Sequence, residues 1–246
     1  LVAPLEKALA HPRVWPVEDF FVAKRDEQVA RHRHYDHVDY KLEPNIKTSP
    51  GGLRDIQTTL WVCSRRYGTT NIDQLVTLGV LSTTEARWLK DGRRFLWWVR
   101  YGLHSLAGRK EDQLHFARQR ELSQRLGFMD TESKSAVELF MQHYYRHVMA
   151  LSDVNDIVLQ HFQEDMTAKK RPSLERLNDR FRLINRRIDI TEPDVFLRNP
   201  SAMLEMFFLM AQREENIRVR VRTIRALREA VHLIDDDFRC DPENCR

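Results

Sequence analysis

The sequence predicts a mainly α protein, consisting of a helical bundle with a smaller C-terminal helical extension. Glycine and proline are scarce, at 8 and 9 of 246 residues, and sheets need more turns than so few of them provide. Apolar residues also recur over long segments at the three- and four-residue spacing of amphipathic helices. Hydrophobic residues make up 42% of the chain and charged residues 31%, which is the balance of a folded domain with a solvated surface.

Helices are predicted where this periodicity is bounded by start or stop signals. In chain order they are expected at residues 17–35, 53–67, 71–80, 84–107, 116–126, 131–162, 202–211 and 223–233. Pro44, Pro50 and the Gly51-Gly52 pair interrupt the pattern between the first two. Gly68 is a natural end for the second helix.

Two local patterns refine this outline. The segment Ser82-Thr83-Thr84-Glu85 is a capping sequence that begins the helix at 84–107. Residues 181–190 alternate between apolar and polar side chains around a polar centre, which favours a short β-hairpin. The hairpin is the one departure from helix that the sequence predicts.

The organisation along the chain suggests three segments. Residues 1–16 contain three prolines and little periodicity, and we interpret them as the tail of an upstream domain. Residues 17–171 form the predicted bundle, and the pattern changes after Pro172, so residues 172–246 form the extension. Because the chain begins with Leu1 rather than Met, we expect it to be a fragment of a longer protein.

Charge and cysteine usage exclude several classes of protein. The 40 basic and 36 acidic residues are interleaved, and the longest basic run is Lys169-Lys170-Arg171, so nucleic-acid binding is not expected. No apolar run approaches the ~20 residues that a membrane span needs. Cys63 lies in an apolar helical run, whereas Cys240 and Cys245 lack the second pair of ligands that a zinc site requires. A cytoplasmic protein is the simplest expectation.

The segment between the first two predicted helices carries the strongest functional pattern. Paired glycines, Gly51 and Gly52, allow a ligand to approach the backbone, and amides at a helix start attract anions. Lys47 and Arg54 add charge that suits phosphate, and Asp55 lies in the first helical turn. The residues alone favour a plainer interpretation, in which the segment is a structural helix entry and Asp55 interacts with the helix dipole.

A second polar cluster lies on the helix at 84–107 and just after it. Arg100 and His104 are four residues apart and share a helix face, with Arg109, Asp112 and Gln119 following. Such a set suits a nucleotide or a partner protein. A polar network that links helices is the more common role, and the residues favour it.

Two metal-like patterns carry little weight. His34, His37 and Asp39 are three potential ligands in a segment without clear periodicity. Asp235 and Asp237 follow a helix and lack a glycine-rich loop before them. We therefore expect no metal site in this chain.

The segment 40–57 resembles a known signature. Tyr-Lys-Leu-Glu-Pro-Asn-Ile-Lys at 40–47 and Gly-Gly-Leu-Arg-Asp-Ile-Gln at 51–57, with Trp61, are similar to the PII uridylyltransferase family. The resemblance continues over nearly the whole chain, at residues 27–28, 31–32, 103–104, 109, 114, 116, 119, 126–128, 141–145, 181, 196, 200 and 223–229. The core at 51–55 is also similar to glutamine synthetase adenylyltransferases, but Leu-Glu-Pro-Asn-Ile-Lys at 42–47 favours the uridylyltransferases.

The resemblance implies a parent enzyme with a nucleotidyltransferase domain, this helical region, an HD hydrolase domain and paired ACT domains. The parent would transfer UMP from UTP to a tyrosine of the PII signal protein with Mg²⁺, and would remove UMP by hydrolysis under glutamine control. Nothing before Tyr40 supplies a Gly-Ser turn with Asp-x-Asp, and no histidine is followed by aspartate. Both active centres and the Mg²⁺ ligands are therefore expected outside this chain, which alone would be inactive.

The preferred hypothesis is that the helical region completes the nucleotide- and PII-binding side of the transferase site and links it to the HD domain. The residues expected to face the nucleotide or PII are Lys47, Gly51, Gly52, Arg54 and Asp55, with Arg100 and His104 as weaker candidates. One alternative is the corresponding segment of a glutamine synthetase adenylyltransferase. The other is a non-catalytic scaffold that docks PII or organises domains.

Overall fold

The computed structural model describes residues 11, 14–35, 42–168, 172–213, 217–242 and 244. The chain divides into two compact units, Leu1–Leu159 and Gln160–Arg246. The predicted mainly α class is confirmed, and the second unit adds one small sheet. Outside the described residues lie most of the segment 1–16, together with His37, Asp39, Lys169-Lys170-Arg171 and Cys245.

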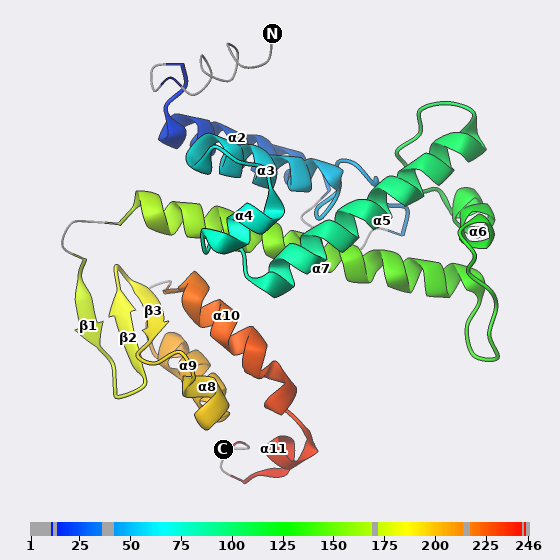
Figure 1. Ribbon diagram of the computed structural model, residues 1–246. Coiled ribbons are helices and arrows are strands. Elements are labelled where there is room, and N and C mark those ends of the chain that lie inside the picture. Colours follow the sequence, from blue (N-terminus) through cyan, green and yellow to red (C-terminus); the bar gives the residue numbers. More distant parts are fainter. Residues whose placement is uncertain are drawn as a thin grey trace. The chain divides into compact units, whose positions relative to one another are not determined.

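Over the described residues, the first unit is built mainly from helices. They are α2 (Val17–Arg33), α3 (Leu53–Tyr67), α4 (Ile72–Thr77), α5 (Thr83–Ala107), α6 (Phe116–Arg125) and most of α7 (Ala136–Met166). Helices α2 and α3 lie side by side, and α5 crosses α7 (Figure 1). At the crossing, a Cβ on Gly92 would lie 2.7 Å from Cγ of Leu151, so the absence of a side chain at Gly92 allows the close approach.

Capping residues set the helix boundaries. Helix α3 has the predicted bounds, and Gly68 ends it in the left-handed conformation at φ 71°. The predicted capping box is present, because Glu85 N donates to Ser82 Oγ at 3.2 Å and Ser82 N donates to Glu85 Oε2 at 2.8 Å. Helix α7 begins at Ala136 rather than at the predicted residue 131. Ser135 and Glu138 form a second capping box there that the sequence analysis missed.

Strands and short helices form the second unit. They are β1 (Leu174–Arg176), β2 (Phe181–Ile184), β3 (Arg187–Ile190), α8 (Val195–Arg198), α9 (Ala202–Ala211), β4 (Arg218–Val219), α10 (Val221–Ala230), the 3₁₀ helix η1 (Val231–Leu233) and α11 (Asp236–Cys240). The sheet order is β1-β2-β3-β4, in which only the β3–β4 pair is parallel.

The predicted hairpin is confirmed as β2 and β3. Phe181 pairs with Ile190 and Leu183 pairs with Ile188, so apolar side chains meet across the ladder. The turn consists of Asn185 and Arg186, both with positive φ of 51° and 61°, as a two-residue hairpin turn requires. The flanking strands β1 and β4 were not predicted, because they are only three and two residues long and β1 is fully exposed.

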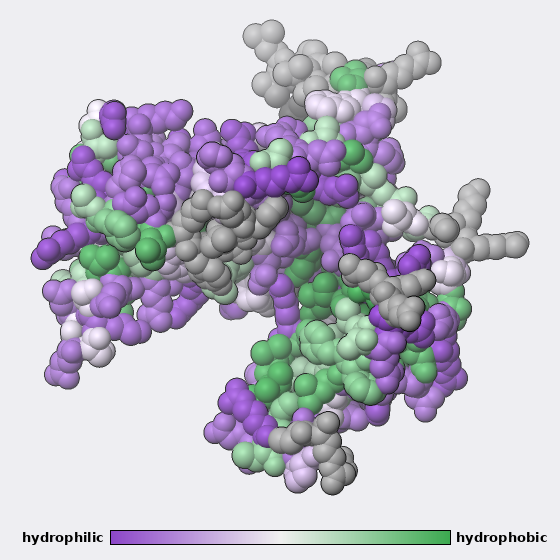
Figure 2. Space-filling view, turned by 180° about the vertical axis from the view of Figure 1, so that it is seen from behind, coloured by the Kyte–Doolittle hydropathy of each residue, from purple (hydrophilic) through white to green (hydrophobic). Residues whose placement is uncertain are grey.

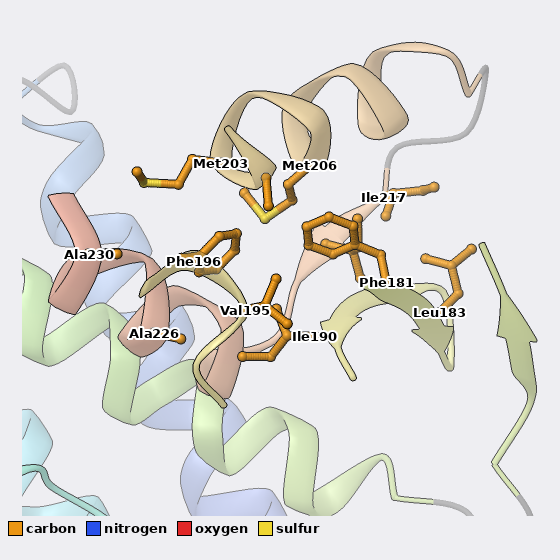
Figure 3. Close-up of a cluster of buried hydrophobic side chains, with 12 residues drawn as sticks. Phe181, Leu183, Ile190, Val195, Phe196, Met203, Met206, Ile217, Ala226 and Ala230 are labelled. Carbon is orange, nitrogen blue, oxygen red and sulfur yellow. The ribbon is translucent and has the colours of Figure 1, made fainter. Parts of the chain in front are cut away.

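The core of the second unit lies between the sheet and its helices. Figure 3 shows Phe181 and Ile190 of the hairpin turned toward Phe196 of α8 and Met206 of α9. Ala226 of α10 closes this cluster, and small residues there let the helix approach. The unit therefore has a hydrophobic core of its own.

Surface hydropathy differs between the units. Figure 2 shows mainly hydrophilic side chains over the first unit on this side, whereas hydrophobic ones gather over part of the second. Exposed apolar residues of the second unit include Leu204, Phe207 and Phe208 of α9. None of the helices in the described ranges combines the length and apolar character that a membrane crossing requires.

Candidate functional site at the bend before helix α3

The bend at residues 44–52 is stabilised by its own side chains. Asn45 Oδ1 accepts hydrogen bonds from Lys47 N at 3.1 Å and Thr48 N at 2.9 Å, as in an Asx turn. Asn45 N in turn donates to Ser49 Oγ at 3.0 Å. The path of the backbone is thereby defined before α3 begins.

A second segment, residues 112–114, pairs with the start of the bend. Ile46 N donates to the carbonyl of Asp112 at 2.8 Å, and Leu114 N donates to the carbonyl of Pro44 at 2.9 Å. These two bonds flank an antiparallel bridge between Asn45 and Gln113. The bend is consequently tied to the connection between α5 and α6.

The two glycines are required by packing. Gly51 has φ +69°, and a Cβ there would collide with the carbonyl of Val148 on α7. A Cβ on Gly52 would lie 2.8 Å from the carbonyl oxygens of Ile46 and Ser49. Both positions therefore exclude side chains for steric reasons that involve no ligand.

The amides at the start of α3 are occupied, which corrects one premise of the sequence analysis. Gly51 N donates to Asp55 Oδ2 at 2.7 Å, and Gly52 N donates to the Ser49 carbonyl at 2.9 Å. The next two amides, those of residues 53 and 54, donate to the carbonyls of Ile46 and Lys47. They were expected to be available to an anion, but the bend folds back and supplies their acceptors itself.

Asp55 lies at the centre of this arrangement and is fully buried. Its carboxylate accepts from Arg31 Nη2 at 2.7 Å, and His32 Nε2 lies 3.1 Å from both of its oxygens. Arg31 Nη1 also donates to the carbonyl of Thr48 at 3.1 Å. Both oxygens of this buried carboxylate therefore have protein partners, and the contacts join α2, the bend and α3.

Behind Asp55, a buried polar group continues the network into α7. Asn155 Nδ2 donates to the Asp55 carbonyl at 3.2 Å and to Thr59 Oγ1 at 2.9 Å. Gln28 Nε2 donates to Asn155 Oδ1 at 2.6 Å. Three helices are thus connected by hydrogen bonds within a largely apolar interior, which fixes their register.

The cations of the site lie at its surface. Lys47 and Arg54 are both partly exposed. The Arg54 guanidinium lies 5.6 Å from the ring centre of Trp61, and Lys24 Nζ lies 4.9 Å from the same ring. The surface at this site therefore combines cationic side chains with the aromatic ring of Trp61, and the buried Asp55 network supports it.

Arg100 and His104 converge on Asp112. Arg100 Nε donates to Asp112 Oδ1 at 2.6 Å, and His104 Nε2 lies 3.3 Å from the same oxygen. Partial burial alone would raise the pKa of Asp112, but the hydrogen bonds and charges of Arg100 and His104 hold this pKa below its usual value of 3.8. The backbone carbonyl of Asp112 accepts a hydrogen bond from Ile46 N. Arg100 and His104, which contact the Asp112 side chain, therefore support the start of the bend.

Comparison with known proteins identifies the family. The profile of the GlnD PII-uridylyltransferase family matches residues 19–159, and that of the uridylyltransferase GlnD third domain matches residues 181–246. The chain belongs to the GlnD PII-uridylyltransferase family. Both profiles are those of uridylyltransferases, so they do not support the adenylyltransferase alternative.

Bifunctional uridylyltransferase/uridylyl-removing enzymes of pseudomonads are similar to this chain. The enzyme of Pseudomonas aeruginosa strain LESB58 is 50% identical and that of Pseudomonas putida strain KT2440 is 52% identical. Each match extends over 232 residues, which are 94% of this chain and 26% of the relative. The chain therefore spans about a quarter of the length of the curated relatives it matches. No solved structure matches it.

Sequence reasoning singled out part of this candidate site. It singled out the bend, Asp55 and the Arg100/His104 pair, and the structure places each at a junction between elements. It named Gln28, Arg31 and His32 as positions of the family resemblance, whereas in the structure Gln28 is buried and the other two are mostly buried.

Two signals in the sequence point to these missed residues. Gln28, Arg31, His32 and Tyr35 have the i, i+3, i+4, i+7 spacing of one helix face, and Tyr35 contacts Thr48 through its hydroxyl at 2.5 Å. Asn155 interrupts an otherwise apolar stripe of α7. A polar side chain in an apolar stripe indicates a buried hydrogen-bonded group, although it does not identify the partners.

Proposed function

We propose that this chain is the helical region of a bifunctional uridylyltransferase/uridylyl-removing enzyme, and that it completes the nucleotide- and PII-facing side of the transferase site. In this proposal the enzyme transfers UMP from UTP to a tyrosine of PII and removes it by hydrolysis, with glutamine as the effector. The bond-making residues are assigned to the parts of the enzyme that this chain does not contain, since it covers about a quarter of its relatives. The chain alone is expected to be inactive.

The observation that carries the proposal is a pair of cations on the bend and on the first turn of α3. Lys47 and Arg54 are partly exposed, and the Lys47 ammonium forms no ion pair or hydrogen bond with any residue in the described ranges. The backbone beneath them is held by Asn45 and Asp55. Cations on a preorganised backbone bind a phosphate group at a lower entropic cost than cations on a mobile loop.

The remaining predicted residues receive supporting roles in this proposal. Gly51 and Gly52 allow the bend to approach α7, and Asp55 anchors it to α2. Arg100 and His104 hold Asp112 at the other end. These residues would position Lys47 and Arg54 without touching nucleotide or PII themselves.

The residues present do not fit a metal site. Nucleotidyl transfer uses Mg²⁺ held by carboxylates, which neutralises the developing charge on the phosphates. Within the described part of the chain, no group of three or more His, Cys, Asp or Glu side chains is placed to hold a metal ion. We assign the Mg²⁺ ligands to the rest of the enzyme and derive no step through the metal here.

The proposal also covers location and neighbouring domains. A cytoplasmic location is consistent with a chain whose Cys63 is a buried free thiol and whose Cys240 is also free. Residues 1–16 would continue from the nucleotidyltransferase domain, residues 17–171 would form the bundle, and residues 172–246 would lead to the HD domain. The two catalytic domains would thus be linked through this region.

The test uses the complete enzyme with Lys47→Ala and Arg54→Ala, singly and together. We expect the double variant to lose at least about tenfold in kcat/KM for uridylylation, because each lost charge–phosphate contact costs on the order of 1.4 kcal/mol or more. A rise in KM for UTP assigns the cations to the nucleotide, and a rise in KM for PII assigns them to the protein substrate. Hydrolytic removal of UMP should be unchanged.

The matched control is Arg66→Ala, which removes an exposed cation from the end of the same helix. It should leave all of these constants unchanged. Uridylylation at the normal rate by the folded Lys47→Ala/Arg54→Ala enzyme would contradict the proposal and reduce the region to a scaffold between domains.

A further inference from the structure

A pocket in the second unit lies between α10, β3 and the C-terminal turns of α7. It has a volume of about 330 Å³ and is lined by His161, Glu164, Ile190, Pro193, Arg220, Val221, Arg222, Arg225, Ala226 and Glu229. This size lies within the range of small-molecule sites. Its walls combine three arginines with apolar surface from four residues.

One buried carboxylate next to the pocket-lining Ile190 in the sequence is shared by several arginines. Asp189 of β3 is fully buried, and Arg182 donates to its Oδ2 through Nε at 3.1 Å and Nη2 at 3.0 Å. The guanidinium groups of Arg220 and Arg222 lie farther from the same oxygen, at 3.8 and 4.0 Å. Asp189 therefore engages Arg182 fully and the other two only weakly.

The second carboxylate is shared in the same way. Glu164 lies 3.4 Å from Arg220 and 3.8 Å from Arg187, and it also accepts from Val221 N at 3.1 Å. Among the described residues, four arginines, at positions 182, 187, 220 and 222, thus share two carboxylates, which is an excess of two positive charges within this group. Arg225 and Glu229 also line the pocket, and their opposite charges leave the excess of positive charge unchanged.

Arg187 is a partly buried member of this group of arginines. Burial lowers the pKa of this guanidinium, Glu164 opposes the decrease, and repulsion from Arg218 and Arg220 adds to it. Arg187 Nη1 is buried and has no hydrogen-bond partner among the described residues. A cluster of this kind is stabilised when an anion binds to it.

Helix α10 directs the arginines toward the pocket. Ala226 and Ala230 face the core (Figure 3), and Arg222, Arg225 and Glu229 follow the i, i+3, i+7 spacing of a different face. One guanidinium group can donate two parallel hydrogen bonds to two oxygens of a phosphate, a geometry that the ammonium group of lysine does not match. The apolar wall of Ile190, Pro193 and Val221 suits the carbon part of a ligand.

We propose that this pocket is a binding site for a phosphate-bearing small molecule, with Arg220, Arg222 and Arg225 as its phosphate ligands. The site lies in the second unit, whereas the bend that carries the proposed transferase role belongs to the first unit. It is therefore an additional ligand site, which does not depend on the uridylylation proposal.

The test is calorimetric titration of the 246-residue chain with inorganic tripolyphosphate at low salt. We expect saturable binding that weakens as salt increases, and at least a tenfold loss of affinity in Arg222→Gln/Arg225→Gln. The variant Arg222→Lys/Arg225→Lys keeps both charges and should bind with intermediate affinity, because only the paired contacts are lost. Circular dichroism establishes that each variant is folded.

Two controls distinguish binding in this pocket from general attraction of an anion to basic side chains. Arg176→Gln/Arg239→Gln removes the same charge from exposed positions of the second unit and should bind as the unsubstituted chain does. Lys47→Ala/Arg54→Ala should also bind normally, which separates this result from the proposed function. Absence of saturable binding, or an equal loss in the Arg176→Gln/Arg239→Gln control, would overturn the proposal.

Discussion

Single residues at the bend act through burial and steric fit. Asp55 is a buried anion whose charge is balanced by Arg31, and His32 also contacts its carboxylate. Removing one member of such a group leaves a mostly buried charge without its ionic partner, which costs more than the ion pair itself contributes. At Gly51 the constraint is steric, because a side chain there would collide with the carbonyl of Val148.

Asp55→Asn should destabilise the first unit by about 3–5 kcal/mol, because Arg31 then remains buried beside an uncharged side chain. Urea unfolding followed by circular dichroism measures this change. Asp26→Asn is the control, since Asp26 is exposed and lies 3.9 Å from Arg25. Its cost should stay under about 0.5 kcal/mol. Equal effects of the two substitutions would show that the Asp55 network contributes little to stability.

Gly51→Ala and Gly108→Ala distinguish a steric constraint from a conformational one. Both glycines have positive φ, of 69° and 63°, so alanine at either costs about 1–2 kcal/mol. Only at Gly51 does the new Cβ also meet a carbonyl, that of Val148, whereas nothing lies within 4 Å at Gly108. We expect Gly51→Ala to lower the free energy of unfolding by at least about 3 kcal/mol. Similar losses for both variants would contradict the packing role of Gly51.

At the scale of elements, α5 and α7 meet through an aromatic and histidine cluster. The His147 ring stacks on Phe95 with centroids 4.6 Å apart, and His147 Nε2 lies 3.1 Å from His143 Nε2. Burial lowers the pKa of both histidines, and Arg146 lowers both further. His143 also lowers the pKa of His147, which Asp91 partly offsets. The contact between the helices is therefore built for neutral imidazoles.

This cluster predicts a pH dependence of stability. The folded state binds protons less readily than the unfolded state, in which histidine has its ordinary pKa of 6.5. Stability is therefore retained above that pH and decreases as the pH falls below it, toward the lowered pKa of the folded state. Chemical unfolding between about pH 7 and 5 should show a steeper loss for the natural chain than for His143→Gln/His147→Gln. Parallel profiles would exclude the histidine pair as the cause.

Element by element, predictability from sequence followed the strength of local signals. Helix α3 was predicted to the residue, because Gly52 and Gly68 mark both ends. The start of α7 was misplaced, because Ser135 and Glu138 were not recognised as a cap. Strand β4 has two residues and exists through its pairing with β3, so no pattern within it identifies it.

For the candidate site, the residue types were predictable and their contacts were not. The bend was recognised as important, but its amides were expected to be free, and the carbonyls of Ile46 and Lys47 accept two of them. Which acceptor an amide finds depends on how the chain folds back. Asp55 was expected to face the nucleotide or PII, with an interaction with the helix dipole as the plainer interpretation. Its main partners in the structure, Arg31 and His32, lie more than twenty residues earlier.

At the scale of the whole molecule, each unit has its own hydrophobic core, and this predicts two unfolding events. Phe196 is fully buried in the second unit, and Phe196→Ala should destabilise that unit by about 3–5 kcal/mol. Asp55→Asn acts within the first unit. In differential scanning calorimetry each substitution should lower one transition temperature and leave the other unchanged.

Phe208→Ala is the matched control for Phe196→Ala, because it makes the same chemical change at a side chain that is 63% exposed. It removes little buried apolar area, so both transitions should stay in place. A single transition that both Phe196→Ala and Asp55→Asn lower equally would mean that the two units unfold as one. The bend and the arginine pocket would then share one folding equilibrium, and a ligand bound at either would raise the same transition temperature.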